Sequence, residues 1–217
     1  MECPDALVLL GDITPARPLT EELFDVLNRV HVYWILGNHD TDDVHCYDNL
    51  LGFEHPNLKH IGSRVVTVKG RDGSSIRLAG LDGVFRGKIW MPTLEELTEE
   101  KSASNRLSVE DYVARMGKGN RWRNGLPLRH RSTIFPETFD QVAQLSTDIL
   151  VTHEAPSPNE MGFPALEWLA HKMQARYAFH GHLHQTIDYG DRGGVRARGV
   201  GCRAIIDLDG RVISPGD

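Results

Sequence analysis

The stretch Trp34-Ile35-Leu36-Gly37-Asn38-His39-Asp40 joins a short apolar run to three consecutive polar side chains. An apolar run such as residues 32–36 is typical of a strand that is buried on both faces of a sheet. Glycine at the junction allows the backbone to approach a metal or a substrate closely. Asn38 offers an amide oxygen to a metal, His39 can carry a proton, and Asp40 can hold an imidazole in one tautomer. The stretch therefore predicts a strand that ends in a catalytic turn.

A second strand and a helix are expected before this turn. Residues 6–10 have the pattern of a buried strand that ends at Gly11-Asp12, and Thr20 is expected to cap a helix that follows. Strand, helix and strand with short connections predict a right-handed βαβ unit, whose two strands end at the same edge of a parallel sheet. Open α/β sheets bind their ligands at that edge. We therefore expect Asp12 to lie close to Asn38.

Two further apolar runs, far along the chain, end in histidines. Residues 149–151 lead to Thr152-His153, and residues 177–179 lead to His180-Gly181-His182-Leu183-His184. A carboxylate, an amide oxygen and three imidazoles suit a borderline divalent metal such as zinc, manganese or iron, whereas calcium or magnesium would favour an oxygen-only shell. We predict as metal ligands Asp12, Asn38, His153, His182 and His184.

The remaining pattern predicts several further elements. A hairpin is expected between residues 65–68 and 76–79, turning at Asp72-Gly73. Helices are expected at 46–51, 139–145 and 163–173, and short strand signals from residue 186 onward suggest a closing meander. An insertion occupies about residues 86–136 and includes a helix at 109–116 that Ser108 caps.

The insertion is locally basic, because residues 110–131 carry six basic and two acidic side chains. One interpretation is a solvated loop. The other is a lid in which Arg121 and Arg123 bind substrate phosphate, or a nucleic-acid surface on which Trp122 stacks against a base.

Composition limits the classes of protein to which the chain can belong. It has 217 residues, 40% of them hydrophobic and 25% charged, which predicts one globular domain over residues 1–217. The net charge of −6 gives no general reason for attraction to a membrane or to nucleic acid. No apolar stretch approaches membrane-spanning length, and the first residues lack the basic flank of a secretory signal, so a cytoplasmic location is expected.

In these motifs the chain resembles the calcineurin-like metallophosphoesterases. Four of the five signature blocks of that family are present in order, namely Gly11-Asp12, Gly37-Asn38-His39-Asp40, Thr152-His153 and Gly181-His182-Leu183-His184. The resemblance implies an α/β fold of two packed mixed β-sheets flanked by helices.

The resemblance also implies a role for each matching residue. Asp12 would bridge two metals, Asn38, His153 and His182 would complete the shell of one, and His184 would bind the other. His39 would protonate the leaving oxygen or stabilise the transition state, and Asp40 would orient His39. The implied reaction is the hydrolysis of a phosphate ester by a metal-activated hydroxide.

The fifth block of the family, an Asp-x-His on an earlier strand, does not occur in the sequence. The residues before Asp12 are too few for another strand and a crossover. Either the chain is shortened at its start, or it is a variant in which one metal position is well formed and the second is weak or empty. The sheet would then lack its first strand, and a second copy of the chain could cover the exposed place.

Two functions follow from these patterns. The first is metal-dependent hydrolysis of a phosphomonoester or a phosphodiester on a phosphorylated substrate. The alternative is a catalytically degenerate member of the fold that acts as an interaction module.

Overall fold

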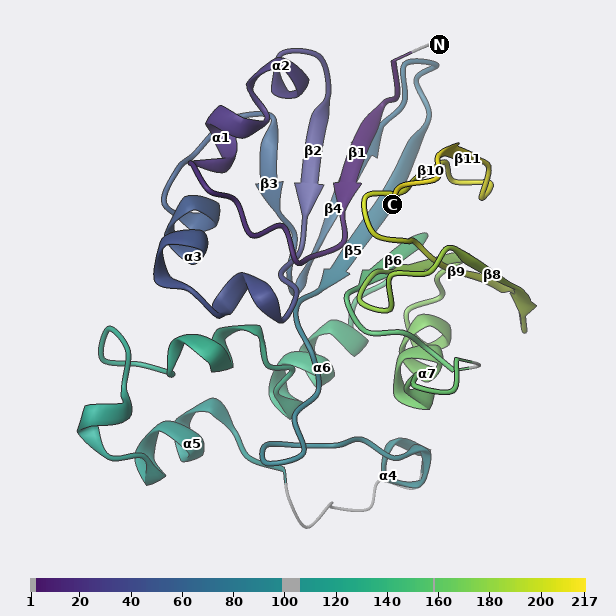
Figure 1. The fold of residues 1–217 in the computed structure, drawn as a ribbon. Helices are drawn as coiled ribbons and strands as arrows, with labels where there is room; N and C mark the ends of the chain where they lie inside the picture. The colour runs from purple at the N-terminus through teal and green to yellow at the C-terminus, as the bar shows by residue number, and fades with distance from the viewer. Residues whose placement is uncertain (1–2, 99–105, 158) are drawn as a thin grey trace.

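Two β-sheets form the centre of the molecule (Figure 1). The structure is a computed structural model that describes residues 3–98, 106–157 and 159–217. The smaller sheet is parallel, in the order β1-β2-β3, with β1 at Ala6–Leu9, β2 at His31–Trp34 and β3 at Leu58–His60. The larger sheet has the order β4-β5-β6-β7-β9-β8. Its strands are β4 (Arg64–Lys69), β5 (Ser75–Leu81), β6 (Ile149–Thr152), β7 (Tyr177–His180), β8 (Ile187–Arg192) and β9 (Val195–Gly199).

Apolar side chains from both sheets meet in a shared core. Tyr33 belongs to β2 and Ile35 directly follows it. Val151 of β6 and Phe179 of β7 are buried with them in one apolar cluster. Burial of apolar surface of this kind is the main force that holds two sheets together. The two-sheet α/β fold expected from the sequence is therefore confirmed.

Helices cover the outer faces of the two sheets (Figure 1). On the smaller sheet, Leu19 and Leu50 pack with Trp34. On the larger sheet, Phe139 and Leu166 pack against the β5–β6 region. The helices are α1 (Leu19–Glu22), α2 (Phe24–Leu27), α3 (Val44–Leu51), α4 (Leu94–Thr98), α5 (Val109–Arg115), α6 (Pro136–Ala143) and α7 (Pro164–Lys172). Three short 3-10 turns are η1 (His39–Thr41), η2 (Lys118–Asn120) and η3 (Leu128–Ser132).

Three expectations about local structure are wrong. The helix expected after Thr20 is broken into α1 and α2, and Pro18 occupies the N-cap because its fixed φ of −44° begins the turn two residues earlier. β1 is half-buried rather than buried on both faces, because among the described strands it pairs with β2 alone. The C-terminal strands do not form a simple meander, because β9 lies parallel to β7 and separates it from β8.

The C-terminal region also contains a small hairpin. β10 (Ile205–Ile206) pairs antiparallel with β11 (Val212–Ser214), and this pair lies near β1 in Figure 1. Ile206 packs on the core cluster that the two sheets share. Along the described residues, no helix is long and apolar enough to span a bilayer.

The segment between β5 and α6 is fastened to the turn that follows β2. Residues 99–105 of the expected insertion lie outside the described residues. Ser108 caps α5 as expected, accepting a hydrogen bond from the amide of Asp111. The buried Thr41 hydroxyl lies 2.7 Å from Ser132 Oγ, 3.4 Å from the carbonyl of Arg129 and 3.2 Å from the carbonyl of Asn38. One hydroxyl therefore joins the insertion to the motif turn.

Replacement of Thr41 with valine tests this connection. Valine keeps the volume of threonine but leaves the buried Ser132 hydroxyl without its partner, so the free energy of unfolding should fall by about 1–3 kcal/mol. Urea unfolding followed by circular dichroism measures the change. Thr67→Val is the matched control, because Thr67 is exposed on β4. Equal midpoints for the two variants would contradict the proposed role of the Thr41 hydroxyl.

Candidate metal centre

Two glycines allow the strand-end loops to come together. A Cβ atom on Gly37 would lie 2.2 Å from Asp12 Oδ1 and 2.7 Å from His153 Cε1. Gly11 has a φ of +89°, and a Cβ there would lie 2.6 Å from His153 Nδ1. Real Cβ atoms do not approach other atoms so closely, and a side chain also disfavours this φ. Glycine is therefore required at both positions if Asp12 and His153 are to meet.

Asp40 fixes the backbone of both loops. Its carboxylate is fully buried and accepts hydrogen bonds from the amides of Asp12 at 2.9 Å, Thr14 at 2.9 Å and Gly37 at 2.8 Å. Burial raises the pKa of Asp40, and these three donors oppose that shift. Asp40 is therefore a structural link between the end of β1 and the end of β2.

The expectation that Asp40 orients His39 is wrong. The carboxylate that contacts the His39 ring belongs to Asp42, whose Oδ2 lies 2.7 Å from His39 Nδ1. The 3-10 turn η1 explains the difference, because residues three apart in such a turn lie on the same side. Asp42 is thus a residue that sequence reasoning missed, although a carboxylate three positions after the histidine was a usable signal.

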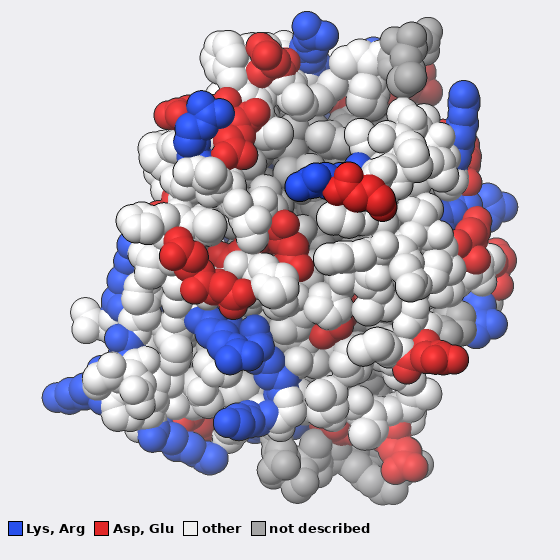
Figure 2. Space-filling model, viewed as in Figure 1, with Lys and Arg blue, Asp and Glu red and all other residues white. Residues whose placement is uncertain are grey.

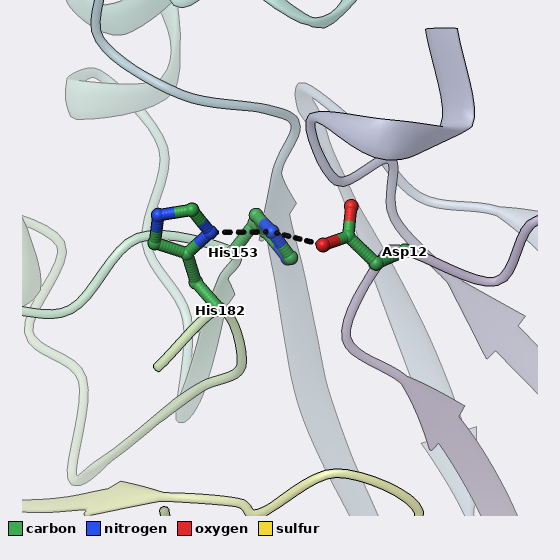
Figure 3. A group of neighbouring side chains, drawn as sticks. All are labelled: Asp12, His153 and His182. Atoms are coloured by element: carbon green, nitrogen blue, oxygen red, sulfur yellow. Dashed lines mark hydrogen bonds and ion pairs between the residues drawn. The ribbon is translucent and has the colours of Figure 1, made fainter. Parts of the chain in front are cut away.

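His153 lies at the centre of the site (Figure 3). Its Nδ1 is 2.7 Å from the carbonyl oxygen of Leu10, which can only accept, so Nδ1 carries a proton. The other ring nitrogen, Nε2, lies 3.2 Å from Asp12 Oδ2, 3.1 Å from Asn38 Oδ1 and 3.1 Å from His182 Nδ1. In the neutral tautomer of His153, several lone pairs therefore face one another.

A divalent cation fits this donor set. One ligand atom each from Asp12, His153 and His182 lies within 4.8 Å of the others, and Asn38 adds an amide oxygen. Burial opposes the charged form of both Asp12 and His153, but their ion pair outweighs it, so the pKa of Asp12 is lowered and that of His153 is raised. A metal would supply the positive charge that a proton on Nε2 otherwise provides. The hydrogen bond to Leu10 is the kind of outer contact that orients histidine ligands.

Backbone strain is concentrated in the loops that carry these groups. Asp12 has a φ of 53°, His182 of 64° and His184 of 53°. Residues with a Cβ atom rarely adopt this left-handed region, and such strain is common at functional sites. The hydrogen bonds of Asp40 and His153 hold the loops in this conformation.

Other predicted residues lie outside this group. His184 is exposed and contributes no ligand atom to the group of Asp12, His153 and His182. The pKa of His182 is lowered first by burial and then by the charge of His153, and the nearby charge of His184 lowers it further. Arg121 donates to the carbonyl of Val113 at 2.9 Å. Arg123 pairs with Asp48 at 2.7 Å, and its guanidinium lies over the Trp122 ring. The metal role of His184 and the substrate role of the two arginines stay predictions.

Glu154 is a second residue that sequence reasoning missed. It directly follows His153, and its Oε2 lies 3.8 Å from His182 Nε2. Its Oε1 accepts from the amide of Phe85 at 3.3 Å. Burial raises the pKa of Glu154 to about 7, although the charge of His153 lowers it. The sequence shows a glutamate beside a predicted histidine ligand, but it does not show that the side chain of this glutamate is buried and directed toward His182.

A model of the calcineurin-like phosphoesterase family matches residues 2–186 of the chain. The chain belongs to this family. A protein of Haemophilus influenzae (strain ATCC 51907 / DSM 11121 / KW20 / Rd), described as an uncharacterized protein, is 33% identical over 208 residues, which are 96% of this chain and 85% of that protein. The metallophosphoesterase fold and the use of divalent metals by the family agree with the cluster at Asp12.

Solved structures resemble the fold at low sequence identity. The crystal structure of TT1561 of Thermus thermophilus has a TM-score of 0.55 at 12% identity, covering 96% of this chain and 84% of that one. The phosphopantetheinyl hydrolase of Mycobacterium tuberculosis has a TM-score of 0.47 at 19% identity, covering 90% of this chain and 79% of that one. At this level the first likeness concerns the fold alone.

Replacement of Asp12 with asparagine should weaken metal binding by at least about 10-fold, because a charged ligand is exchanged for a neutral one. Titration of Mn²⁺ into metal-free protein, followed by calorimetry, measures the affinity. Asp25→Asn is the matched control, since Asp25 is an exposed carboxylate on α2. Equal affinity in the two variants would place the ion elsewhere.

Replacement of Asp40 with asparagine should lower the free energy of unfolding by about 2–3 kcal/mol, because the amide nitrogen cannot accept from the backbone N–H groups that one of the two carboxylate oxygens binds. Asp43→Asn is the control: Asp43 caps α3 by accepting from the amides of His45 and Cys46, and asparagine caps helices equally well. Chemical unfolding of metal-free protein compares them. An Asp40 variant as stable as the Asp43 variant would show that the carboxylate does not fix the two loops.

Proposed function

We propose that the protein is a hydrolase of phosphate esters that binds its substrate at the Asp12–His153–His182 group. The observation that carries this proposal is the set of lone pairs around His153 Nε2. The exposed His39, whose ring contacts the carboxylate of Asp42, lies in the loop beside this set. When bound, a divalent metal at these residues would polarise the phosphoryl group and lower the pKa of a water molecule. Zinc, manganese and iron all suit the donor set.

His39 is the proposed general acid. In the imidazolium form of His39, Nδ1 donates a hydrogen bond to Asp42, and the proton on Nε2 can pass to the leaving oxygen as the phosphorus–oxygen bond breaks. The amide of His39 donates to Asp12 Oδ1 at 2.8 Å, so the acid and the metal ligand share one loop. Water supplies the oxygen that joins phosphorus, and its proton restores the acid.

Hydrolysis of 4-nitrophenyl phosphate and of bis(4-nitrophenyl) phosphate with added Mn²⁺, Zn²⁺ or Fe²⁺ tests the function and separates a monoesterase from a diesterase. His39→Gln should lower kcat by about 10²–10⁴-fold, as expected for loss of a general acid, and leave Mn²⁺ affinity nearly unchanged. Asp42→Asn should lower kcat in the same direction and by less, because the imidazole remains but loses its anionic partner.

Folded wild-type protein that binds metal but hydrolyses neither ester with any of these ions would overturn the proposal. That result would favour the alternative of an interaction module built on the same fold. An unchanged kcat in His39→Gln would keep the hydrolase but remove His39 as its acid.

A further inference from the structure

Arg86 occupies a fixed position beside the metal centre. Its half-buried guanidinium donates through Nε to Thr133 Oγ1 at 3.0 Å and through Nη2 to the carbonyl of Arg129 at 3.4 Å. The preceding residue, Phe85, donates its amide to Glu154. Arg86 is therefore adjacent in the chain to a residue that contacts the Glu154 carboxylate.

The backbone of Arg129 connects Arg86 to the turn that follows β2. Its carbonyl oxygen accepts from Arg86 and lies 3.4 Å from the Thr41 hydroxyl. That hydroxyl is also 3.2 Å from the carbonyl oxygen of Asn38. The Arg86 guanidinium and the Arg129 backbone thus lie between the turn that carries Asn38 and the strand end that carries Glu154. The like-charge effect of Arg129 on Arg86 places the Arg129 guanidinium near them.

The charges of these arginines are not neutralised by ion pairs within the described part of the chain. Burial lowers the pKa of Arg86, and the like charge of Arg129 lowers it further, against opposing effects of Asp42 and Glu154. Among the residues that the structure describes, no carboxylate oxygen forms an ion pair within 4.0 Å with Arg86 or with Arg129. Arg123, in contrast, is paired with Asp48.

Positive charge gathers more widely around this pair. Burial lowers the pKa of His130, and the charges of Arg86, Arg129 and Lys88 lower it further, which places these three cations near one another. In Figure 2, lysine and arginine side chains gather over the lower left of the molecule, over the segment between β5 and α6, and acidic side chains lie above them. An anion placed between the metal centre and the insertion would meet these guanidinium groups.

We propose that Arg86 and Arg129 bind a second anionic group of the substrate, a phosphate or a carboxylate, while the scissile phosphoryl group lies at the Asp12–His153–His182 group. The substrate class is then a small phosphate ester that carries another negative charge. Guanidinium groups suit this task because they bind carboxylate or phosphate with two parallel hydrogen bonds. This inference rests on the proposed function and specifies its substrate. It is separate from the predicted substrate role of Arg121 and Arg123, which donate to the Val113 carbonyl and to Asp48.

Two matched pairs of substrates test the inference. Glycerol 3-phosphate and 3-phosphoglycerate differ by a carboxylate, and fructose 6-phosphate and fructose 1,6-bisphosphate differ by a phosphate. Wild-type protein loaded with Mn²⁺ should prefer the more anionic member of at least one pair in kcat/KM. Arg129→Ala should reduce that preference about 10-fold or more, mainly through KM, since a charge-assisted hydrogen bond is lost. Arg129 is exposed, so the variant should fold, and Arg86→Lys should retain part of the preference.

Arg115→Ala is the control, because Arg115 is an exposed arginine at the end of α5 in the same insertion. Thermal shifts of the Mn²⁺-loaded protein with each compound measure binding without turnover. If no ester is hydrolysed but the more anionic compounds stabilise wild type and not Arg129→Ala, the hydrolase fails and the anion site stands. Wild-type protein that shows no preference in either assay would overturn the anion site. So would an Arg129→Ala variant that loses activity or binding equally for both members of each pair, or that behaves like Arg115→Ala.

Discussion

The buried carboxylate of Asp40 is the contact on which the site depends. It accepts three backbone N–H groups, two from the loop after β1 and one from the loop after β2. Without an acceptor those donors would be buried and unpaired, which costs more than the net gain of a hydrogen bond in water. The same contacts hold Asp12 at a positive φ, so one carboxylate sets both the approach of the loops and the direction of a candidate metal ligand.

The second sheet reaches this pair of loops through a single ring. His153, at the end of β6, donates to the carbonyl of Leu10 and directs its other nitrogen at Asp12. A carbonyl at the end of β1 therefore determines which nitrogen of His153 faces the other ligands. The metal centre lies where the two sheets meet, and its geometry depends on their packing as much as on its own residues.

Much of the fold and part of the site could be predicted from local pattern. Each of β1, β2, β6 and β7 is an apolar run, and a polar residue of a type that can bind metal lies within a few residues of its end. The structure places all four strands close to their expected positions. What failed depended on turn geometry and on distant contacts. The partner of His39 is decided by the 3-10 turn η1, and the partner of Asp40 by amides 26 and 28 residues away. The position of β9 between β7 and β8 is likewise a pairing choice that short strand signals do not record.

The charge of the whole chain was an equally poor guide to recognition. A net charge of −6 argues against anion binding only if charges are spread evenly, and lysine and arginine side chains gather at the lower left of the face in Figure 2. A count of arginines within the insertion does not show which of them contact the protein itself, as Arg121 and Arg123 do. No described carboxylate pairs with Arg86 or Arg129, whereas Arg123 is paired with Asp48. Under the proposed function, substrate recognition would depend on which guanidinium groups the fold leaves without a carboxylate, and the packed structure identifies them where the sequence does not.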